Sequence, residues 1–416
     1  MATVIKKVYL YQLLFAFCLI TPYFNNFELT FAVWSISALI TVQKNYSLSI
    51  LKQVSCFMAI LFISIIVMFN KEHHFYFIIR DFTYLIKPVL GLLIGYQLCK
   101  KFPQKAFQTI IYISLFIAAY HFYLIFSGIL FFKALTVNDI RFRAGYFSDF
   151  EVYALIILLF HKKFELNLNR KKILFYSIFI GFSTFMYLAR TNFIQFIILF
   201  LALKGYFEVN RRLIIVLLSI IIVSAIGYSA ILYINPKRNG AGIEAFLYKI
   251  KVAPIEPFKT KINRENWKDL NDNYRSYENI MTVRQVSRDG FYSIIFGQGL
   301  GSQVDLKQKI WLGDMKLRYI SILHNGFMTV FLKSGLLGVF FVIISIFLLF
   351  KKQKTDIPIV KQINYLMIGS GLFLIASYWV FMGYYFIADT KAIFLGFLIC
   401  YRELALKDNI KLLQND

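Results

Sequence analysis

The chain has 416 residues, of which 59% are hydrophobic and 19% aromatic, and its mean hydropathy is +0.62. This composition excludes a water-soluble domain and predicts a polytopic membrane protein. The net charge of +24 does not indicate a nucleic-acid-binding protein, because the lysines and arginines are spread along the chain rather than gathered in one patch. Cys18, Cys56, Cys99 and Cys400 are scattered in or beside apolar runs, so neither a disulfide framework nor a zinc site can be built from them.

The apolar runs predict an all-α integral membrane protein with about twelve transmembrane helices. Lys6 and Lys7 precede the first run as in a signal peptide, but no cleavage site of small residues follows, so we interpret this run as a span. The predicted spans cover residues 8–24, 27–42, 54–69, 82–98, 107–131, 145–160, 173–188, 192–203, 213–233, 322–350, 365–386 and 392–400.

The basic residues predict the orientation of these spans. They concentrate in alternate connections and in both terminal segments, which are therefore expected to be cytoplasmic. This divides one integrated membrane domain into helices at 1–233 (about nine spans), a large external loop at 234–321, and about three spans with a cytoplasmic tail at 322–416.

The external loop contains two predicted amphipathic helices, FLYKIK at 246–251 and VRQVSRDGFYSIIF at 283–296, which we expect to lie on the membrane surface and cover the outer mouth. The second helix carries Arg284 and Arg288 on its polar side. Gly297, Gly299 and Gly301 follow it. Taken alone, these glycines indicate a flexible loop, although glycine also lets backbone N–H groups approach an anion.

The stretch HNGFMTVFLKSGLLG opens the run that follows the loop. On one continuous helix, Gly335 and Gly338 would return to within about 40° of the direction of His324 and allow close approach of another helix or a lipid-linked substrate. His324 is then a titratable group at a membrane surface. The spacing alone also fits ordinary helix packing, and the His324–Asn325 pair also fits a helix N-cap or an interface.

Polar residues in the other external connections are further candidates. Arg190 lies between two apolar runs with no acidic residue nearby, and an ionisable residue at such depth is a functional candidate by default. Arg141 and Arg143 precede Asp149 and Glu151, and Arg80 precedes Asp81; snorkelling or local ion pairing is the alternative for these. His73, His74, His121 and His161 are dispersed, and no Asp-x-Asp pair occurs, so we predict no metal site and no cofactor.

The arrangement His-Asn, nine residues, Gly, two residues, Gly, after a large polar loop, resembles the signature of the O-antigen ligase and polymerase superfamily of bacterial membrane glycosyltransferases. Gly297, Gly299 and Gly301, preceded by Arg284, resemble a glycine segment that many members carry. Members also have an arginine after an earlier helix, often following Ser or Thr, and Arg190 corresponds to it with Ala189 before it. The resemblance is specific from Arg284 to Gly338 and only topological over most of the chain.

The resemblance implies an enzyme of the bacterial inner membrane, with both termini cytoplasmic and the active site facing the periplasm. It would transfer a glycan from undecaprenyl diphosphate to an acceptor hydroxyl, without a metal and with inversion. His324 would be the base, and Asn325 would orient the imidazole ring or the acceptor. Arg190 and Arg284 would bind the diphosphate, with Arg141, Arg143 and Arg288 in reserve.

Within that family a repeat-unit polymerase is the expectation. The bilayer is an expected partner, and family analogy adds a chain-length regulator. A ligase that attaches the glycan to lipid A core or protein is the alternative. A flippase for lipid-linked sugars, which is a transporter and not an enzyme of this family, is a second hypothesis.

Overall fold

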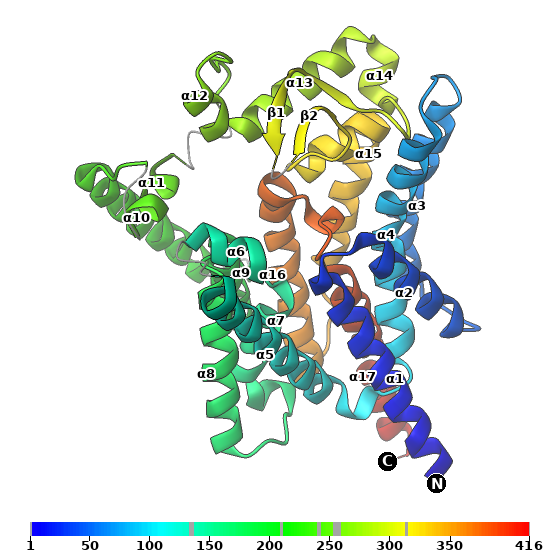
Figure 1. Ribbon diagram of the computed structural model, residues 1–416. Helices are drawn as coiled ribbons and strands as arrows, with labels where there is room; N and C mark the ends of the chain where they lie inside the picture. Colours follow the sequence, from blue (N-terminus) through cyan, green and yellow to red (C-terminus); the bar gives the residue numbers. More distant parts are fainter. Residues whose placement is uncertain are drawn as a thin grey trace.

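The computed structural model describes residues 2–132, 137–208, 211–238, 243–252, 259–312 and 315–415, and it is 75% helical (Figure 1). The α-helices are α1 (Ala2–Ile20), α2 (Phe27–Ile40), α3 (Leu48–Met68), α4 (Phe75–Cys99), α5 (Ala106–Phe132), α6 (Val137–Ala144), α7 (Asp149–Leu159), α8 (Arg170–Met186), α9 (Arg190–Leu203), α10 (Arg211–Ile234), α11 (Ile243–Val252), α12 (Trp267–Asp272), α13 (Tyr274–Arg288), α14 (Phe291–Phe296), α15 (Gly326–Leu349), α16 (Pro358–Phe381) and α17 (Lys391–Asn415). Short 3-10 turns are η1 (Thr21–Phe24), η2 (Pro103–Lys105), η3 (His161–Phe164) and η5 (Gly383–Tyr385).

Five helices in the described part of the chain are long and apolar enough to cross a membrane, so the predicted count of twelve spans is not confirmed. These segments are Lys7–Phe24, Leu48–Met68, Ala106–Phe131, Gly326–Leu349 and Pro358–Phe381. Several other predicted spans form shorter helices: α2 and α9 have 14 residues each, and α7 has 11. A helix needs roughly 20 residues to cross the hydrocarbon core, which apolar composition alone does not guarantee.

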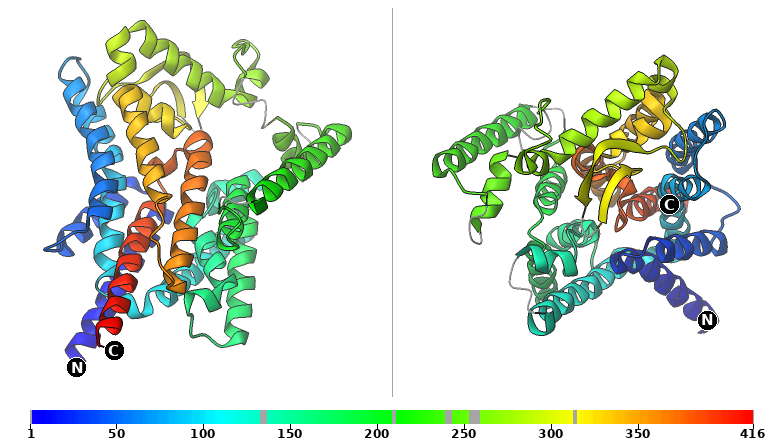
Figure 2. Two further views of the ribbon diagram at one scale, coloured as in Figure 1. Left: turned by 180° about the vertical axis from the view of Figure 1, so that it is seen from behind. Right: turned by 45° about the horizontal axis from the view of Figure 1, so that its top comes forward.

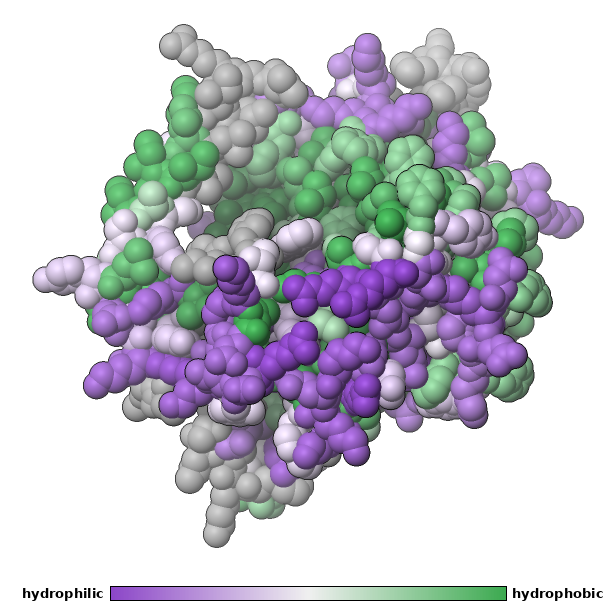
Figure 3. Space-filling model, turned by 90° about the horizontal axis from the view of Figure 1, so that it is seen from above, coloured by the Kyte–Doolittle hydropathy of each residue, from purple (hydrophilic) through white to green (hydrophobic). Residues whose placement is uncertain are grey.

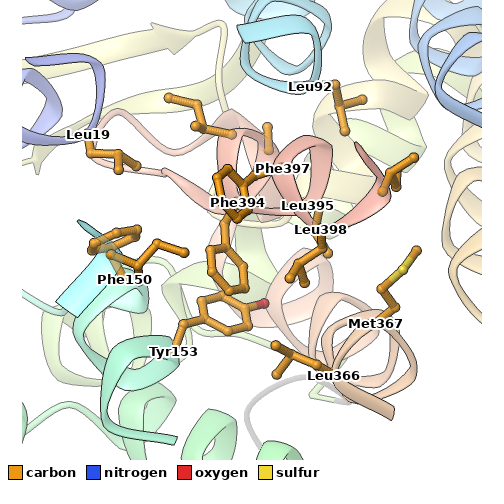
Figure 4. Close-up of a cluster of buried hydrophobic side chains, with 14 of the residues drawn as sticks. Leu19, Leu92, Phe150, Tyr153, Leu366, Met367, Phe394, Leu395, Phe397 and Leu398 are labelled. Atoms are coloured by element: carbon orange, nitrogen blue, oxygen red, sulfur yellow. The ribbon is translucent and has the colours of Figure 1, made fainter. Parts of the chain in front are cut away.

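The two termini lie at one end of the bundle, and α12, α13, α14 and the strands lie at the other (Figures 1 and 2). α4 packs along α17, α3 along α15, and α9 along α16. The α4–α17 contact is close because glycines face backbone: a Cβ on Gly95 would lie 1.9 Å from the carbonyl oxygen of Ile393. Phe394 of α17 stacks on Tyr153 of α7 with ring centroids 4.1 Å apart in the main core (Figure 4).

A β-hairpin at the end of the molecule opposite the termini (Figure 1) was not part of the all-α prediction. Strands β1 (Val304–Leu312) and β2 (Met315–Ile320) pair antiparallel, with an irregularity in register between Asp305 and Ile310. Gly290, with φ of 100°, also ends the helix predicted at 283–296, so that α13 and α14 are separate. The hairpin signal was present in the sequence as alternating apolar and polar residues on both sides of a Gly-Asp pair.

α15 breaks at Gly335, which has φ of 64° and ψ of −162°, so the expectation of one continuous helical face from His324 to Gly338 is wrong. The carbonyls of Leu332 and Lys333, just before the break, accept hydrogen bonds from the backbone N–H groups of Gln298 (2.8 Å) and Gly299 (3.1 Å). The segment 297–301, here called the glycine loop, thereby satisfies carbonyls that the interrupted helix leaves open. At Gly335 itself a Cβ would lie 2.2 Å from the carbonyl oxygen of Ile295.

A buried ion pair holds the glycine loop to the bundle. Lys333 Nζ of α15 lies 2.5 Å from Asp81 Oδ2 of α4, and both side chains are at most 2% exposed. The same carboxylate accepts a hydrogen bond from Gly301 N at 2.7 Å, and Lys333 also donates to the carbonyl of Ser302. Arg80 Nε is 3.9 Å from Asp81 Oδ1, so the local pair considered from the sequence is the weaker of the two contacts.

We expect Asp81→Asn to lower the free energy of unfolding by about 3–5 kcal/mol, because it leaves the Lys333 ammonium buried without its counter-charge. Thermal and denaturant unfolding of the purified protein in detergent, followed by tryptophan fluorescence, measures this. Lys71→Met is the matched control, since it removes an exposed ion pair with Asp289 and should cost at most about 1 kcal/mol. Equal effects of the two substitutions would contradict the role assigned to the buried pair.

We expect Gly335→Ala to destabilise the protein by more than about 1 kcal/mol, because alanine disfavours this positive φ and its Cβ would overlap Ile295. Gly227→Ala in α10 is the control, since a Cβ there meets nothing within 4 Å and alanine favours the helix. The yield of monodisperse protein and its melting temperature report both effects. A Gly335→Ala variant as stable as Gly227→Ala would show that the break is not required.

Candidate active site

His324 lies in the turn between β2 and α15, just before the helix begins. Asn325 is the N-cap, and its side-chain oxygen accepts a hydrogen bond from Met328 N at 3.2 Å. The carbonyl of His324 accepts a hydrogen bond from Met382 N at 3.0 Å, which ties the turn to the end of α16. The backbone of His324 is therefore held by its own helix cap and by a second helix.

Glu278 of α13 is the side-chain partner of His324. Both carboxylate oxygens lie 3.0 Å from His324 Nδ1, and one also accepts a hydrogen bond from His324 N at 3.1 Å. The Glu278 side chain is 1% exposed, whereas that of His324 is 45% exposed. A carboxylate at Nδ1 selects the tautomer that carries its proton there, which leaves Nε2 as the acceptor nitrogen.

Tyr274 completes the surroundings of this pair. Its ring lies edge-on to the imidazole, with centroids 5.7 Å apart and an interplanar angle of 89°. Burial, and secondarily the Glu278 carboxylate, raises the pKa of Tyr274 well above its usual value, so the phenol remains neutral. The Glu278–His324 dyad is thus a carboxylate–imidazole pair with one side buried against protein and the other reachable from solvent.

Asn325 has a structural role at the start of α15. Its side-chain oxygen caps α15, and Glu278 makes the contact that orients the imidazole. Glu278 lies 46 positions before His324 in the sequence. No local pattern could pair them, although Glu278 was visible as one acid in a charged stretch of the external loop.

The backbone N–H groups of the glycine loop are already engaged. Those of Gln298 and Gly299 donate to α15, that of Leu300 donates to the carbonyl of Ser64 at 3.1 Å, and that of Gly301 donates to Asp81. The loop therefore packs α3, α4 and α15 together. In this arrangement each of these N–H groups bonds another part of the protein.

The five candidate arginines fall into two groups. Arg190 begins α9, directly after Tyr187 and Ala189, which pack with Phe381 and Phe386 around the end of α16. Arg141 and Arg143 belong to α6, which packs against α5, and Gly145, directly after α6, approaches the ring of Tyr187. The connection after α16 therefore lies against the Arg190 turn and also bonds the His324 carbonyl.

Arg284 and Arg288 form the second group, exposed on α13. Arg284 lies six residues after Glu278, which directs the two side chains about 120° apart around the helix. Arg284 therefore lines a cavity on a different face of α13 from the dyad. α13 therefore presents Glu278 of the dyad on one face and Arg284 of the cavity on another.

A buried charge cluster lies at the start of α17 and was not identified from the sequence. Lys391 Nζ is 2.5 Å from Asp149 Oδ2 of α7 and also contacts Asp389. Lys87 of α4 donates to the carbonyls of Phe386 and Ile387 in the same connection. All four charged side chains belong to residues at most 2% exposed. Lys87 was the available signal, because it lies inside the apolar run at 82–98, where charged residues are rare.

Three of the other histidines make hydrogen-bond contacts within the protein. His73 Nε2 lies 3.1 Å from the carbonyl of Gln298, His74 caps α4 through its contact with Tyr76 N, and His121 contacts Ser183 at 2.9 Å. Within the described ranges, no group of three or more His, Cys, Asp or Glu residues is arranged to hold a metal ion.

The chain matches no protein-family model, no curated protein and no solved structure. These comparisons give no support to the predicted resemblance to the O-antigen ligase and polymerase superfamily.

Proposed function

We propose that this protein is a membrane glycosyltransferase that moves a glycan from a polyprenyl diphosphate carrier to an acceptor hydroxyl on the outer side of the bacterial inner membrane. The Glu278–His324 dyad is the observation that carries the proposal. It lies at the end of the bundle opposite both termini (Figure 1). Cytoplasmic termini would then place the dyad in the periplasm.

The dyad suits the proton transfer in this reaction. The acceptor oxygen attacks the anomeric carbon, the bond from that carbon to the diphosphate oxygen breaks, and the acceptor proton passes to His324 Nε2. Glu278 holds the opposite proton and stabilises the imidazolium that forms. A single displacement of this kind inverts the anomeric carbon. The diphosphate leaves with the bonding electron pair as an anion, so the donor is already activated.

Arg190 is the preferred ligand of the diphosphate, with Arg141 and Arg143 as further candidates. A guanidinium stays charged and can grip phosphate oxygens with two parallel hydrogen bonds. The support for Arg190 is its position against the connection that also bonds the His324 carbonyl. Arg284 and Arg288 remain candidates for a separate part of the substrate, because α13 directs Arg284 away from Glu278.

A repeat-unit polymerase is the form of the activity that we propose, with a second lipid-linked glycan as acceptor. Attachment of the finished glycan to lipid A core or protein uses the same donor and the same chemistry. A chain-length regulator is a proposed partner only for the polymerase.

A flippase for lipid-linked sugars is the second candidate function, and the buried cluster of Lys87, Asp149, Asp389 and Lys391 is the observation that favours it. Charged groups inside a membrane domain are typical of transport pathways. A flippase would not require a base at His324.

We expect His324→Ala to reduce glycan transfer by about 10²–10⁴-fold, because it removes the group that accepts the proton. Glu278→Gln should cause a smaller loss, since the amide oxygen can still accept from Nδ1 but brings no charge. Purified protein in liposomes with a lipid-linked glycan provides the assay, and His161→Ala, in η3 outside the candidate site, is the matched control. Undiminished transfer by His324→Ala would refute the base assignment, and intact lipid flipping without any transfer in the wild type would favour the flippase.

In cells that lack the protein, we expect surface glycans to collapse to a single repeat still joined to its final acceptor, because a polymerase acts before attachment. Gel separation of surface and lipid-linked glycans, with and without a complementing copy, measures this. Long chains held on the carrier would instead identify a ligase. Loss of all externally exposed glycan would identify a flippase.

A further inference from the structure

A cavity of about 550 Å³ opens in the external layer between segment 259–264 and one face of α13. Tyr277, Ile280, Met281 and Arg284 line it from α13, and Asp269 lines it from α12. Viewed from above, this end of the molecule carries a broad gathering of hydrophilic side chains beside hydrophobic ones (Figure 3). The volume suits one or two sugar rings rather than a single small ion.

The rim of the cavity is strongly basic. Lys259, Lys261, Arg264 and Arg284 face a single carboxylate, Asp269. Lys259 is paired with that carboxylate, which also accepts hydrogen bonds from Asn263 N and Asn273 Nδ2, each at 2.9 Å. These contacts, led by Lys259, hold the pKa of Asp269 below its usual range, so the carboxylate stays charged and occupied.

Three cations of the rim remain for a ligand. Across the described parts of the chain, no carboxylate forms an ion pair with Lys261, Arg264 or Arg284. All three residues are exposed to solvent. Three unpaired cations around one concave surface attract an anion more strongly than the same charges on a convex surface.

The floor of the cavity is apolar and well anchored. Tyr277 and Met281 are 3% and 5% exposed and belong to the core beneath α13. The hydroxyl of Tyr277 donates to the carbonyl of Leu306 in β1, and the Arg264 guanidinium lies 5.8 Å from the Tyr277 ring centroid. An apolar floor below a basic rim fits a pyranose ring that carries an acidic group; a free phosphate has no apolar surface to place there.

We propose that this cavity binds an acidic sugar of the transferred glycan, one that bears a carboxylate or phosphate substituent. The proposal rests on the glycosyltransferase function and adds its substrate class. Lys261, Arg264 and Arg284 contact the acidic group, and the ring lies against Tyr277 and Met281. The cavity is on a different face of α13 from the dyad, so it holds a part of the glycan away from the reacting bond.

Binding of short saccharides to the full-length protein in phosphatidylcholine nanodiscs tests this by isothermal titration calorimetry. The probes are trigalacturonate, the neutral trisaccharide maltotriose, and inorganic pyrophosphate. We expect trigalacturonate to bind, maltotriose to bind at least tenfold more weakly, and the acidic probe to weaken as salt rises. Absence of trigalacturonate binding, equal binding of maltotriose, or binding of pyrophosphate alone would overturn the proposal.

Variants assign the binding to this cavity. Lys261→Gln/Arg264→Gln should weaken trigalacturonate binding at least tenfold, whereas Lys268→Gln, an exposed lysine of α12 that does not line the cavity, should leave it unchanged. An equal effect of both variants would overturn the assignment. His324→Ala should bind trigalacturonate like the wild type. If the wild type transfers glycan but does not bind trigalacturonate, the proposed sugar-binding cavity is refuted and the proposed enzyme is not. If the wild type binds trigalacturonate but transfers no glycan, the proposed enzyme activity is refuted and the binding cavity is not.

Discussion

The break in α15 at Gly335 is the constraint on which the outer layer depends. It opens two helix carbonyls to the glycine loop, which then reaches α3 through Leu300 and α4 through Asp81. Lys333, two residues before the break, closes the assembly with a buried ion pair. Because a buried charge is costly without its partner, α4, α15 and the loop have one strongly preferred relative position.

That position also determines where Glu278 lies. α13 is joined to β1 by the Tyr277 hydroxyl, and Gln285 bonds both the glycine loop and the backbone of Asp305. The helix that presents Glu278 is therefore fastened to the same scaffold that starts α15 beside His324. A catalytic pair needs this precision, because a hydrogen bond between side chains weakens steeply with small displacements.

The connection after α16 brings together features that are distant in the chain. Met382 bonds the carbonyl of His324, Phe381 and Phe386 pack against the Arg190 turn, and Asp389 contacts Lys391 in the buried charge cluster. A shift of this connection would move the Glu278–His324 dyad, the Arg190 turn and the buried charge cluster relative to one another. The basic cavity on α13 stands apart from this connection, consistent with a role in holding a remote part of a substrate.

Composition and patterning in the sequence predicted a helical protein of membrane type with a polar layer after residue 233, and they offered a helix N-cap as one interpretation of the His324–Asn325 pair. These follow from local rules: apolar content, helix propensity and capping act within a few residues. The lengths of the helices, of which five in the described residues are long and apolar enough to span a membrane, were visible only in the structure. The hairpin, the break at Gly335 and the pairing of Lys333 with Asp81 and of His324 with Glu278 were likewise decided by tertiary structure. Lys333 and Asp81 are 252 positions apart, and His324 and Glu278 are 46 apart, so no periodic pattern in the sequence relates either pair. A glycine in an apolar run gives the same sequence pattern whether it allows close packing of a straight helix or breaks the helix.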